Sequence, residues 1–322
     1  MIETAATHPA NAGMRTFIEP HRGYRRRRLV NGFSLALTGL MVLIALVPLF
    51  WILGYVFLKG SQYINLDFFI HTPTPMGVPG GGVLHAIEGT ILLSILAGIF
   101  AIPPGVLAAF YAAQRPNTTL GIAVRFGTDV LSGVPSIVIG LFGYALIVRP
   151  DGHYSALAGG VALAILMLPT IIRTTEEMLK LVPHTLREGS LALGAPEWKT
   201  AMRVTFPAAL NGIVTGFLLG LARASGETAP LLFTALGNDR FEIGRMITTG
   251  LHSGQSLPVV LYNILEQPVD SLPLTLFKYT QQPFPERVNQ SWAVALVLML
   301  LVLLTNLGAR FYVHYRSTRN GG

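Results

Sequence analysis

Arg223 and Glu227 are the two side chains of this sequence best suited to chemistry, because they interrupt a long apolar stretch that runs over 211–236. The stretch is long enough to cross a bilayer as a helix. A charge at the middle of a bilayer costs about 3 kcal/mol, so such residues pair with each other or line a polar path. A separation of four residues puts both side chains on one helical face. A guanidinium presents a fork of N–H donors that suits an oxyanion such as phosphate.

The residues allow two interpretations of this pair. In the first, Arg223 lines a pathway and binds an anion, while Glu227 orients the guanidinium or accepts a hydrogen bond from a protonated oxyanion. In the second, the two form a structural ion pair between packed helices, which small neighbours would allow: Ala222, Ala224, Ser225, Gly226 and Ala229. The histidines show no spacing typical of metal ligands, and no serine–histidine–acid set is recognisable. We therefore predict no catalytic residue and no metal site.

The composition places these residues in a membrane protein. The chain has 322 residues, of which 51% are hydrophobic and 12% charged, whereas soluble domains carry about 25% charged residues. Without cysteine it can form neither a disulfide nor a thiolate metal site. The predicted fold class is all-α, a polytopic membrane protein with six transmembrane helices. The six apolar stretches lie at 29–58, 89–114, 130–148, 154–172, 211–236 and 291–309.

The distribution of lysine and arginine orients the predicted spans. Six spans put both termini on one side, and the segments on that side carry sixteen of the 23 basic residues. The opposite side carries six, so the positive-inside rule places both termini in the cytoplasm. Six arginines before the first span fit this orientation signal and argue against a nucleic-acid arm. The predicted organisation is a basic tail (1–28), a membrane domain (29–313) that contains a cytoplasmic loop (174–207) and an outer segment (239–290), and a C-terminal tail (314–322). Short surface helices and loops are expected in the outer segment, because its apolar stretches are too short to cross a membrane.

The cytoplasmic loop has a helical pattern of its own. Thr185 and Glu188 fit a capping box, which predicts a short helix that begins after Thr185 and continues to about Leu193. Gly194 then supplies a turn that residues with a β-carbon resist.

A second short helix is predicted after that turn. Pro196 fits its first position. The helix should end near Thr205, because Phe206 precedes Pro207 and is disfavoured in a helix. Two short helices about a glycine turn would make a rigid knob that passes a domain motion into the membrane. The alternative is an ordinary cytoplasmic helical hairpin in which Glu188 serves only as a cap.

The spacing of this loop resembles the loop by which permease subunits of ABC importers contact their ATPase. The family pattern is Glu-Ala-Ala, three residues, Gly, nine residues and Ile-x-Leu-Pro, and this chain keeps every interval while replacing Ala-Ala by Gly-Ser. The resemblance implies a type I, MetI-like permease fold. The chain has no Gly-x-x-x-x-Gly-Lys-Ser/Thr phosphate loop, so we expect ATP and Mg²⁺ on the partner and no cofactor on this chain. The implied ATPase-coupling residues are Thr185, Glu188, Gly189, Ser190, Gly194 and Pro207.

A narrower resemblance rests on the charged pair. Arg223, the run Gly226-Glu227-Thr228 and the run Ala-Pro-Leu-Leu-Phe-Thr at 229–234 are similar to PstA-type permeases of phosphate importers. This implies a non-enzymatic subunit of the bacterial inner membrane that imports inorganic phosphate into the cytoplasm by alternating access, with Arg223 and Glu227 on the substrate pathway. The implied partners are two ATP-binding subunits, a PstC-type permease, an external phosphate-binding protein and the lipid bilayer, with no nucleic acid. The alternatives are a permease for another oxyanion such as molybdate or sulfate, a secondary transporter, and a membrane sensor scaffold.

Overall fold

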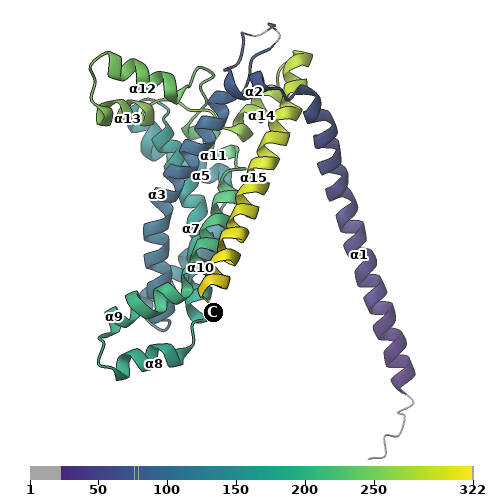
Figure 1. Cartoon of the computed structure of the whole chain (residues 1–322), viewed down its shortest axis with the longest axis vertical. Helices are drawn as coiled ribbons and strands as arrows, with labels where there is room; N and C mark the ends of the chain where they lie inside the picture. The colour runs from purple at the N-terminus through teal and green to yellow at the C-terminus, as the bar shows by residue number, and fades with distance from the viewer. Residues whose placement is uncertain (1–22, 76, 79, 321–322) are drawn as a thin grey trace, which may run out of the picture. The chain divides into compact units, whose positions relative to one another are not determined.

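The computed structural model describes residues 23–320 except positions 76 and 79, so most of the predicted N-terminal tail lies outside the described residues. The described chain is almost entirely helical (Figure 1). Its β contacts are two isolated bridges, Pro73 with Gly81 and Leu236 with Val269. The predicted all-α class is therefore confirmed for this part of the chain.

The chain divides into two compact units, 1–55 and 56–322. Most of the helix α1 (Gly23–Gly60) belongs to the first unit, and it contains Pro48. Its side chains at 26–52 are all exposed although most are apolar. A helix that is hydrophobic on every side is stable when lipid or protein surrounds it, which agrees with the predicted first span.

Three long helices pack together at the centre of the second unit: α3 (Leu84–Gln114), α7 (Ala156–Lys180) and α10 (Phe206–Ala224). Glycines bring α3 and α7 close together, since a β-carbon at Gly160 would lie 2.6 Å from the β-carbon of Leu96. Small residues at helix contacts are how membrane helices approach each other. A fourth long helix, α15 (Pro285–Asn320), packs against α10.

The third predicted span, 130–148, is not one straight helix. The chain forms α4 (Thr119–Gly133) and α5 (Ser136–Gly143). The helical stretch Ser136–Asp151, which begins with α5, is bent by 103° relative to α4. The bend falls at Val134, which is extended because Pro135 follows it and disfavours a helical residue there. By length and composition the described residues hold five helices that could cross a membrane, or six if the bent pair counts as one span. After α5 come a π-helical turn (Tyr144–Val148) and α6 (Arg149–Asp151).

The fifth predicted span, 211–236, is also broken. The helix α10 ends at Ala224, and a short helix α11 (Ala229–Thr234) follows after four residues. Pro230 lies in the first turn of α11, where a missing N–H costs nothing. The break begins just after Arg223 and contains Glu227, so the two charged residues do not share one continuous helix.

The outer segment forms the predicted short helices α12 (Ile243–His252), α13 (Leu257–Leu265) and α14 (Leu272–Thr280). The expectation of surface helices is wrong for α14, because Leu272 and Leu274 are fully buried. This helix packs against α15. Among the described residues of 61–83, the helical elements are a 3-10 turn (Ser61–Tyr63) and α2 (Leu66–Ile70). Within the second unit, α12 and α13 lie at the end opposite α8 (His184–Ala192) and α9 (Glu197–Thr200) (Figure 1).

Candidate functional site

The residues 184–200, here called the elbow, consist of α8, a turn and α9. Gly194 forms the turn with a left-handed φ of +81°, as its sequence predicts. The predicted capping box is wrong: α8 begins at His184 after Pro183, and Thr185 lies inside the helix rather than at its cap. Pro183 fixes that start because a proline's own φ suits entry into a helix and it needs no N–H partner. The end of α8 at Ala192 is within one residue of the predicted end.

The second helix of the elbow does not end near Thr205. A π-helical turn (Ala201–Thr205) follows α9, and Phe206 has helical dihedral angles, so the helix passes through Pro207 into α10. A π turn shifts the hydrogen-bond register by one residue, which accommodates a proline whose nitrogen cannot donate. Residues Glu197–Ala224 therefore form one 28-residue helix that joins the elbow to the span bearing Arg223. Glu197 and Arg223 are separated along this helix by about 39 Å.

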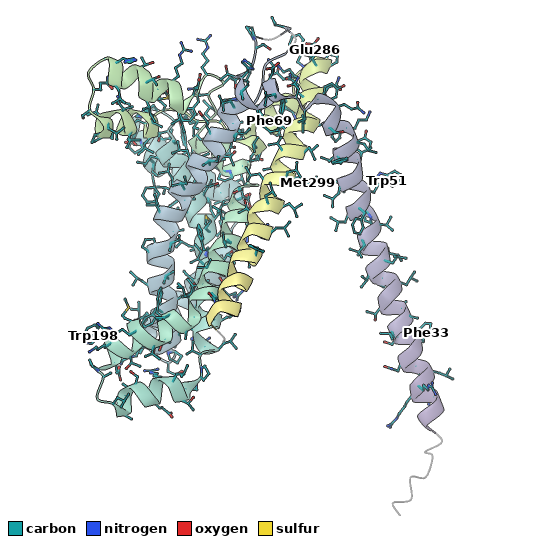
Figure 2. The ribbon with its side chains drawn as sticks, in the orientation of Figure 1. Phe33, Trp51, Phe69, Trp198, Glu286 and Met299 are labelled. Atoms are coloured by element: carbon teal, nitrogen blue, oxygen red, sulfur yellow. The ribbon has the colours of Figure 1, made fainter. Side chains whose placement is uncertain are left out.

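The surface of the elbow carries exposed apolar side chains and one carboxylate that has no ion-pair partner among the described residues. Leu193 is 90% exposed and Trp198 is 69% exposed, and the Trp198 side chain points away from the helices (Figure 2). Glu188 is exposed and forms no ion pair with any described residue. Exposed apolar side chains gathered in one place are typical of a protein–protein contact. Where α9 begins, Arg115 Nη2 lies 3.4 Å from Glu197 Oε2, which ties the end of α3 to the elbow.

The structure brings Arg223 and Glu227 together at the far end of α10. Arg223 Nε lies 3.9 Å from Glu227 Oε1, a distance too long for a hydrogen bond. The Arg223 side chain is 53% exposed and that of Glu227 is 23% exposed. Arg223 belongs to the last helical turn and Glu227 to the break that follows. The guanidinium thus keeps most of its donors available to a ligand or to another chain.

A large cavity lies beside this break but does not include the charged pair. It has a volume of about 780 Å³ and is lined mainly by apolar residues of α3, α10 and α15. Its polar lining is small and includes Ser94 and Ser225, whose hydroxyl oxygens lie 3.3 Å apart. An anion would lose its hydration in such a cavity without gaining charge partners, so the cavity does not suit an oxyanion.

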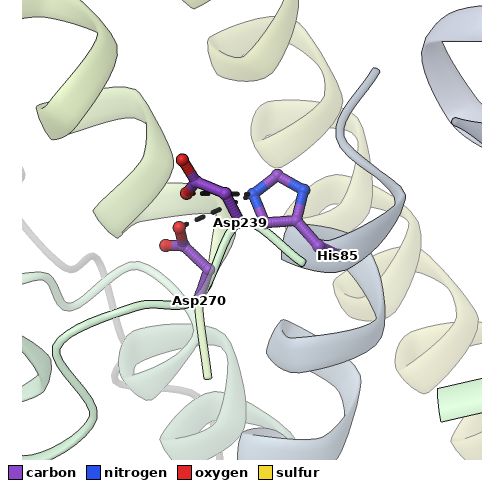
Figure 3. A group of neighbouring side chains, drawn as sticks. All are labelled: His85, Asp239 and Asp270. Carbon is purple, nitrogen blue, oxygen red and sulfur yellow. Dashed lines mark ion pairs between the residues drawn. The ribbon is translucent and has the colours of Figure 1, made fainter. Parts of the chain in front are cut away.

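A buried charge cluster at the end of the second unit opposite the elbow is absent from the sequence predictions. His85 and Asp270 are fully buried, with His85 Nε2 3.5 Å from Asp270 Oδ2 and 4.0 Å from Asp239 Oδ1 (Figure 3). The three residues offer possible metal-ligand atoms within 4.8 Å of one another. However, the ammonium of Lys278 contacts Asp270 and lies 2.7 Å from Asp239 Oδ1. A lysine therefore stands where a cation would bind, and the arrangement does not favour a metal site.

Opposite effects set the pKa of Asp270 and of Lys278. Burial alone would raise the pKa of the Asp270 carboxyl, but the neighbouring His85 and Lys278 outweigh it and hold that pKa below its usual value. Burial alone would lower the pKa of the Lys278 ammonium, but Asp270 and Asp239 outweigh it and raise that pKa. Both groups are therefore charged at neutral pH. No local spacing could have revealed the cluster, because its members come from distant parts of the sequence.

The fold and the site define an all-helical, multi-pass membrane protein. The chain belongs to the family described as binding-protein-dependent transport system inner membrane component, which matches residues 105–314. It is 40% identical over 285 residues to the phosphate transport system permease protein PstA of Yersinia pestis, covering 88% of this chain and 90% of that protein. It is 41% identical to the PstA of Xylella fastidiosa (strain Temecula1), covering 89% of this chain and 93% of that protein.

Solved structures agree on the fold at low sequence identity. The MetNI methionine ABC transporter in an inward-facing form gives a TM-score of 0.53 at 18% identity, covering 72% of this chain and 95% of that chain. A bacterial alginate ABC transporter gives a TM-score of 0.55 at 14% identity, covering 92% of this chain and 98% of that chain. Both similarities support the predicted permease fold.

Proposed function

We propose that this chain is a permease subunit of an ATP-driven importer that moves inorganic phosphate across the bacterial inner membrane into the cytoplasm. One observation carries the proposal: relatives described as phosphate transport system permease protein PstA are about 40% identical over about nine tenths of both chains. Agreement over nearly the whole length, and not over one module, supports a shared role. The apolar helices and the family membership support a transport component rather than an enzyme.

The proposed partners are inferred from the lack of a phosphate loop in the sequence and from the exposed side chains of the elbow. The sequence contains no phosphate loop for ATP, so ATP and Mg²⁺ would bind to two separate ATP-binding subunits. The exposed apolar surface of the elbow and the free carboxylate of Glu188 suit a contact with such a subunit. A PstC-type permease and an external phosphate-binding protein would complete the assembly. Both termini and the elbow would then face the cytoplasm, as the basic residues indicate.

The continuous helix Glu197–Ala224 gives a physical route for coupling. Closure of the ATP-binding subunits would displace the elbow, and a helix transmits that displacement better than a loop would. Arg223 lies at the other end of the same helix. A change in the tilt of the helix would move the guanidinium between an outward-facing and an inward-facing position, which is alternating access at the level of one side chain.

Arg223 would hold the phosphate through paired N–H donors, and Glu227 would orient the guanidinium. Because one arginine beside one glutamate has a net charge near zero, a phosphate dianion needs further positive charge. The exposed half of the Arg223 side chain can face the partner permease, whose cations would supply that charge.

The experiment is uptake of radiolabelled phosphate into membrane vesicles that contain this chain with its partner subunits. We expect uptake that requires ATP and that excess sulfate or molybdate does not reduce. Uptake of sulfate or molybdate in preference to phosphate would reject the proposed substrate. Uptake that continues without ATP would reject the proposed energy source.

A further inference from the structure

A second cavity, of about 630 Å³, lies between α12 and α13. These two helices lie at the end of the second unit opposite the elbow (Figure 1). Two guanidinium groups line it together with neutral polar side chains. No aspartate or glutamate is among the lining residues. Its main polar lining consists of Arg240, Arg245, Thr249, Ser253, Asn263 and Gln267.

The two guanidinium groups of this cavity have no direct partner among the described residues. Among the described residues, neither Arg240 nor Arg245 forms an ion pair, and neither guanidinium donates a hydrogen bond. The nearest acids in the sequence are engaged elsewhere or lie outside the cavity. Asp239 binds Lys278, and Glu266 lies 2.8 Å from His153. Glu242 and Asp239 line an adjoining cavity of about 460 Å³ together with both arginines, but neither acid forms an ion pair with them.

Two arginines that form no ion pair with a described residue are suited to bind an oxyanion. Each guanidinium has five N–H donors in a planar fork, and the fork matches the oxygens of a phosphate group. Thr249, whose hydroxyl has no hydrogen-bond partner among the described residues, adds a neutral donor at the same cavity. We propose that the cavity between α12 and α13 binds a phosphate-group oxyanion through Arg240 and Arg245.

The phosphate group has two possible sources with the same chemistry. Free inorganic phosphate would make the cavity a capture site ahead of Arg223, and this source rests on the proposed function. The headgroup of an anionic phospholipid is the other source, because α13 exposes apolar side chains beside the cavity. These are Leu257, Val259, Leu261 and Tyr262, between 46% and 61% exposed. The guanidinium groups would bind the phosphate of such a headgroup, and the apolar side chains of α13 would contact its acyl chains.

The test uses the full-length chain in phosphatidylcholine nanodiscs, titrated with inorganic phosphate by calorimetry at constant ionic strength. All variants carry Arg223→Gln so that the charged pair of α10 does not contribute. We expect saturable binding that weakens at least about tenfold when Arg240→Gln and Arg245→Gln are combined. The matched control combines Lys59→Gln with Arg149→Gln, which removes the same charge from exposed sites outside the cavity and should leave binding within about twofold.

A second experiment, on lipid binding, distinguishes inorganic phosphate from a phospholipid headgroup as the ligand. Nanodiscs that also contain phosphatidylglycerol are dissolved in mild detergent, and the lipid retained by the protein is identified by mass spectrometry. Retention that depends on Arg240 and Arg245, without binding of inorganic phosphate, assigns the cavity to a headgroup. Binding of inorganic phosphate that depends on the same residues, without lipid retention, assigns it to the free ion.

Two results would overturn the inference. One is that the parent and the Arg240→Gln/Arg245→Gln variant bind both ligands equally. The other is that the matched control loses as much ligand binding as that variant, which would mean that the ligand is attracted by overall charge and not by this cavity. If the double variant fails to fold, Arg245→Gln alone, at an exposed position, is judged by the same criteria. Failure of the proposed function is seen separately: vesicles with intact Arg223 would not accumulate phosphate while the cavity still bound its ligand.

Discussion

The side-chain oxygens of Ser190 and Thr200 lie 2.9 Å apart and join α8 to α9 across the turn at Gly194. Thr200 is buried, whereas most of the elbow is exposed. A hydrogen bond of this kind contributes about 1 kcal/mol. It fixes the angle between two short helices that otherwise make few contacts with each other, so the elbow moves as one body.

Gly194→Ala should loosen the elbow. Nothing lies within 4 Å of a β-carbon at this position, so the cost comes from the left-handed backbone alone and amounts to about 1–2 kcal/mol. We expect faster hydrogen exchange in α8 and α9 and weaker retention of the ATP-binding subunits during purification. Gly189→Ala is the matched control, because Gly189 is helical, has equally open space and should gain slightly in stability. Alanine is also the residue of the resembled family pattern at this position, so the contact with the ATP-binding subunits should be kept. Equal behaviour of the two variants would contradict the role given to the turn.

Glu188→Lys should abolish association with the ATP-binding subunits, because it reverses the one free carboxylate of α8 at a protein contact. The side chain is exposed and forms no ion pair with a described residue, so the variant should insert and fold normally. The measurement is co-purification of the ATP-binding subunits. Glu286→Lys makes the same charge change at an exposed position at the other end of the second unit (Figure 2) and should retain them.

Arg223→Gln should abolish phosphate uptake while the assembled complex stays intact. Half of this side chain is exposed and its nearest contact to Glu227 is long, so the expected change in unfolding free energy is within about 0.5 kcal/mol. Arg223→Lys keeps the positive charge but lacks the planar fork of guanidinium N–H donors, so it should give intermediate phosphate uptake. Vesicle uptake and complex recovery are measured together. Normal uptake by Arg223→Gln would make the pair purely structural.

Asp270→Asn should destabilise the protein by about 3 kcal/mol, because it leaves Lys278 without its fully buried partner. The pKa of Asp270 is lower in the folded protein than in the unfolded chain. Its contribution to stability is therefore present above the unfolded value of about 4 and is lost as pH falls through the lower folded value.

The measurement for this cluster is the midpoint of thermal unfolding as a function of pH. The parent should lose stability in that acidic range, and Asp270→Asn should lose less there. Asp67→Asn is the control, because Asp67 is exposed and its removal should leave the pH dependence unchanged. A parallel pH dependence of the parent and Asp270→Asn would show that the carboxylate does not stabilise the cluster.

The sequence predicts those features that depend on neighbouring residues. Uninterrupted apolar runs locate the long helices, and Gly194 locates the turn of the elbow. The sequence shows that Pro135 lies in the third span, but it does not determine the angle of the bend that follows α4. The 103° angle depends on the packing of α5 against α11, where a β-carbon at Gly140 would lie 2.7 Å from the Cα of Pro230.

Features that depend on distant contacts escape prediction. The π turn before Pro207 overrides the local preference of Phe206, and only the packed structure shows which of the two prevails. The cluster of His85, Asp270 and Lys278 joins the start of α3 to the outer segment, and no interval along the chain marks it. For Arg223 and Glu227 the sequence indicates proximity but not the break of the helix between them.

The helix Glu197–Ala224 has no loop along its length, and at its π turn Ala201 and Thr205 are buried. The helix is therefore a rigid connection between the elbow, which would contact the ATP-binding subunits, and the Arg223 guanidinium, which would contact the anion. On the proposed function, Arg223 could not change position independently of the elbow. Because the position of Arg223 would depend on the position of the elbow, phosphate would not leak through passively. The number of ions moved would then be fixed for each round of ATP hydrolysis by the partner subunits.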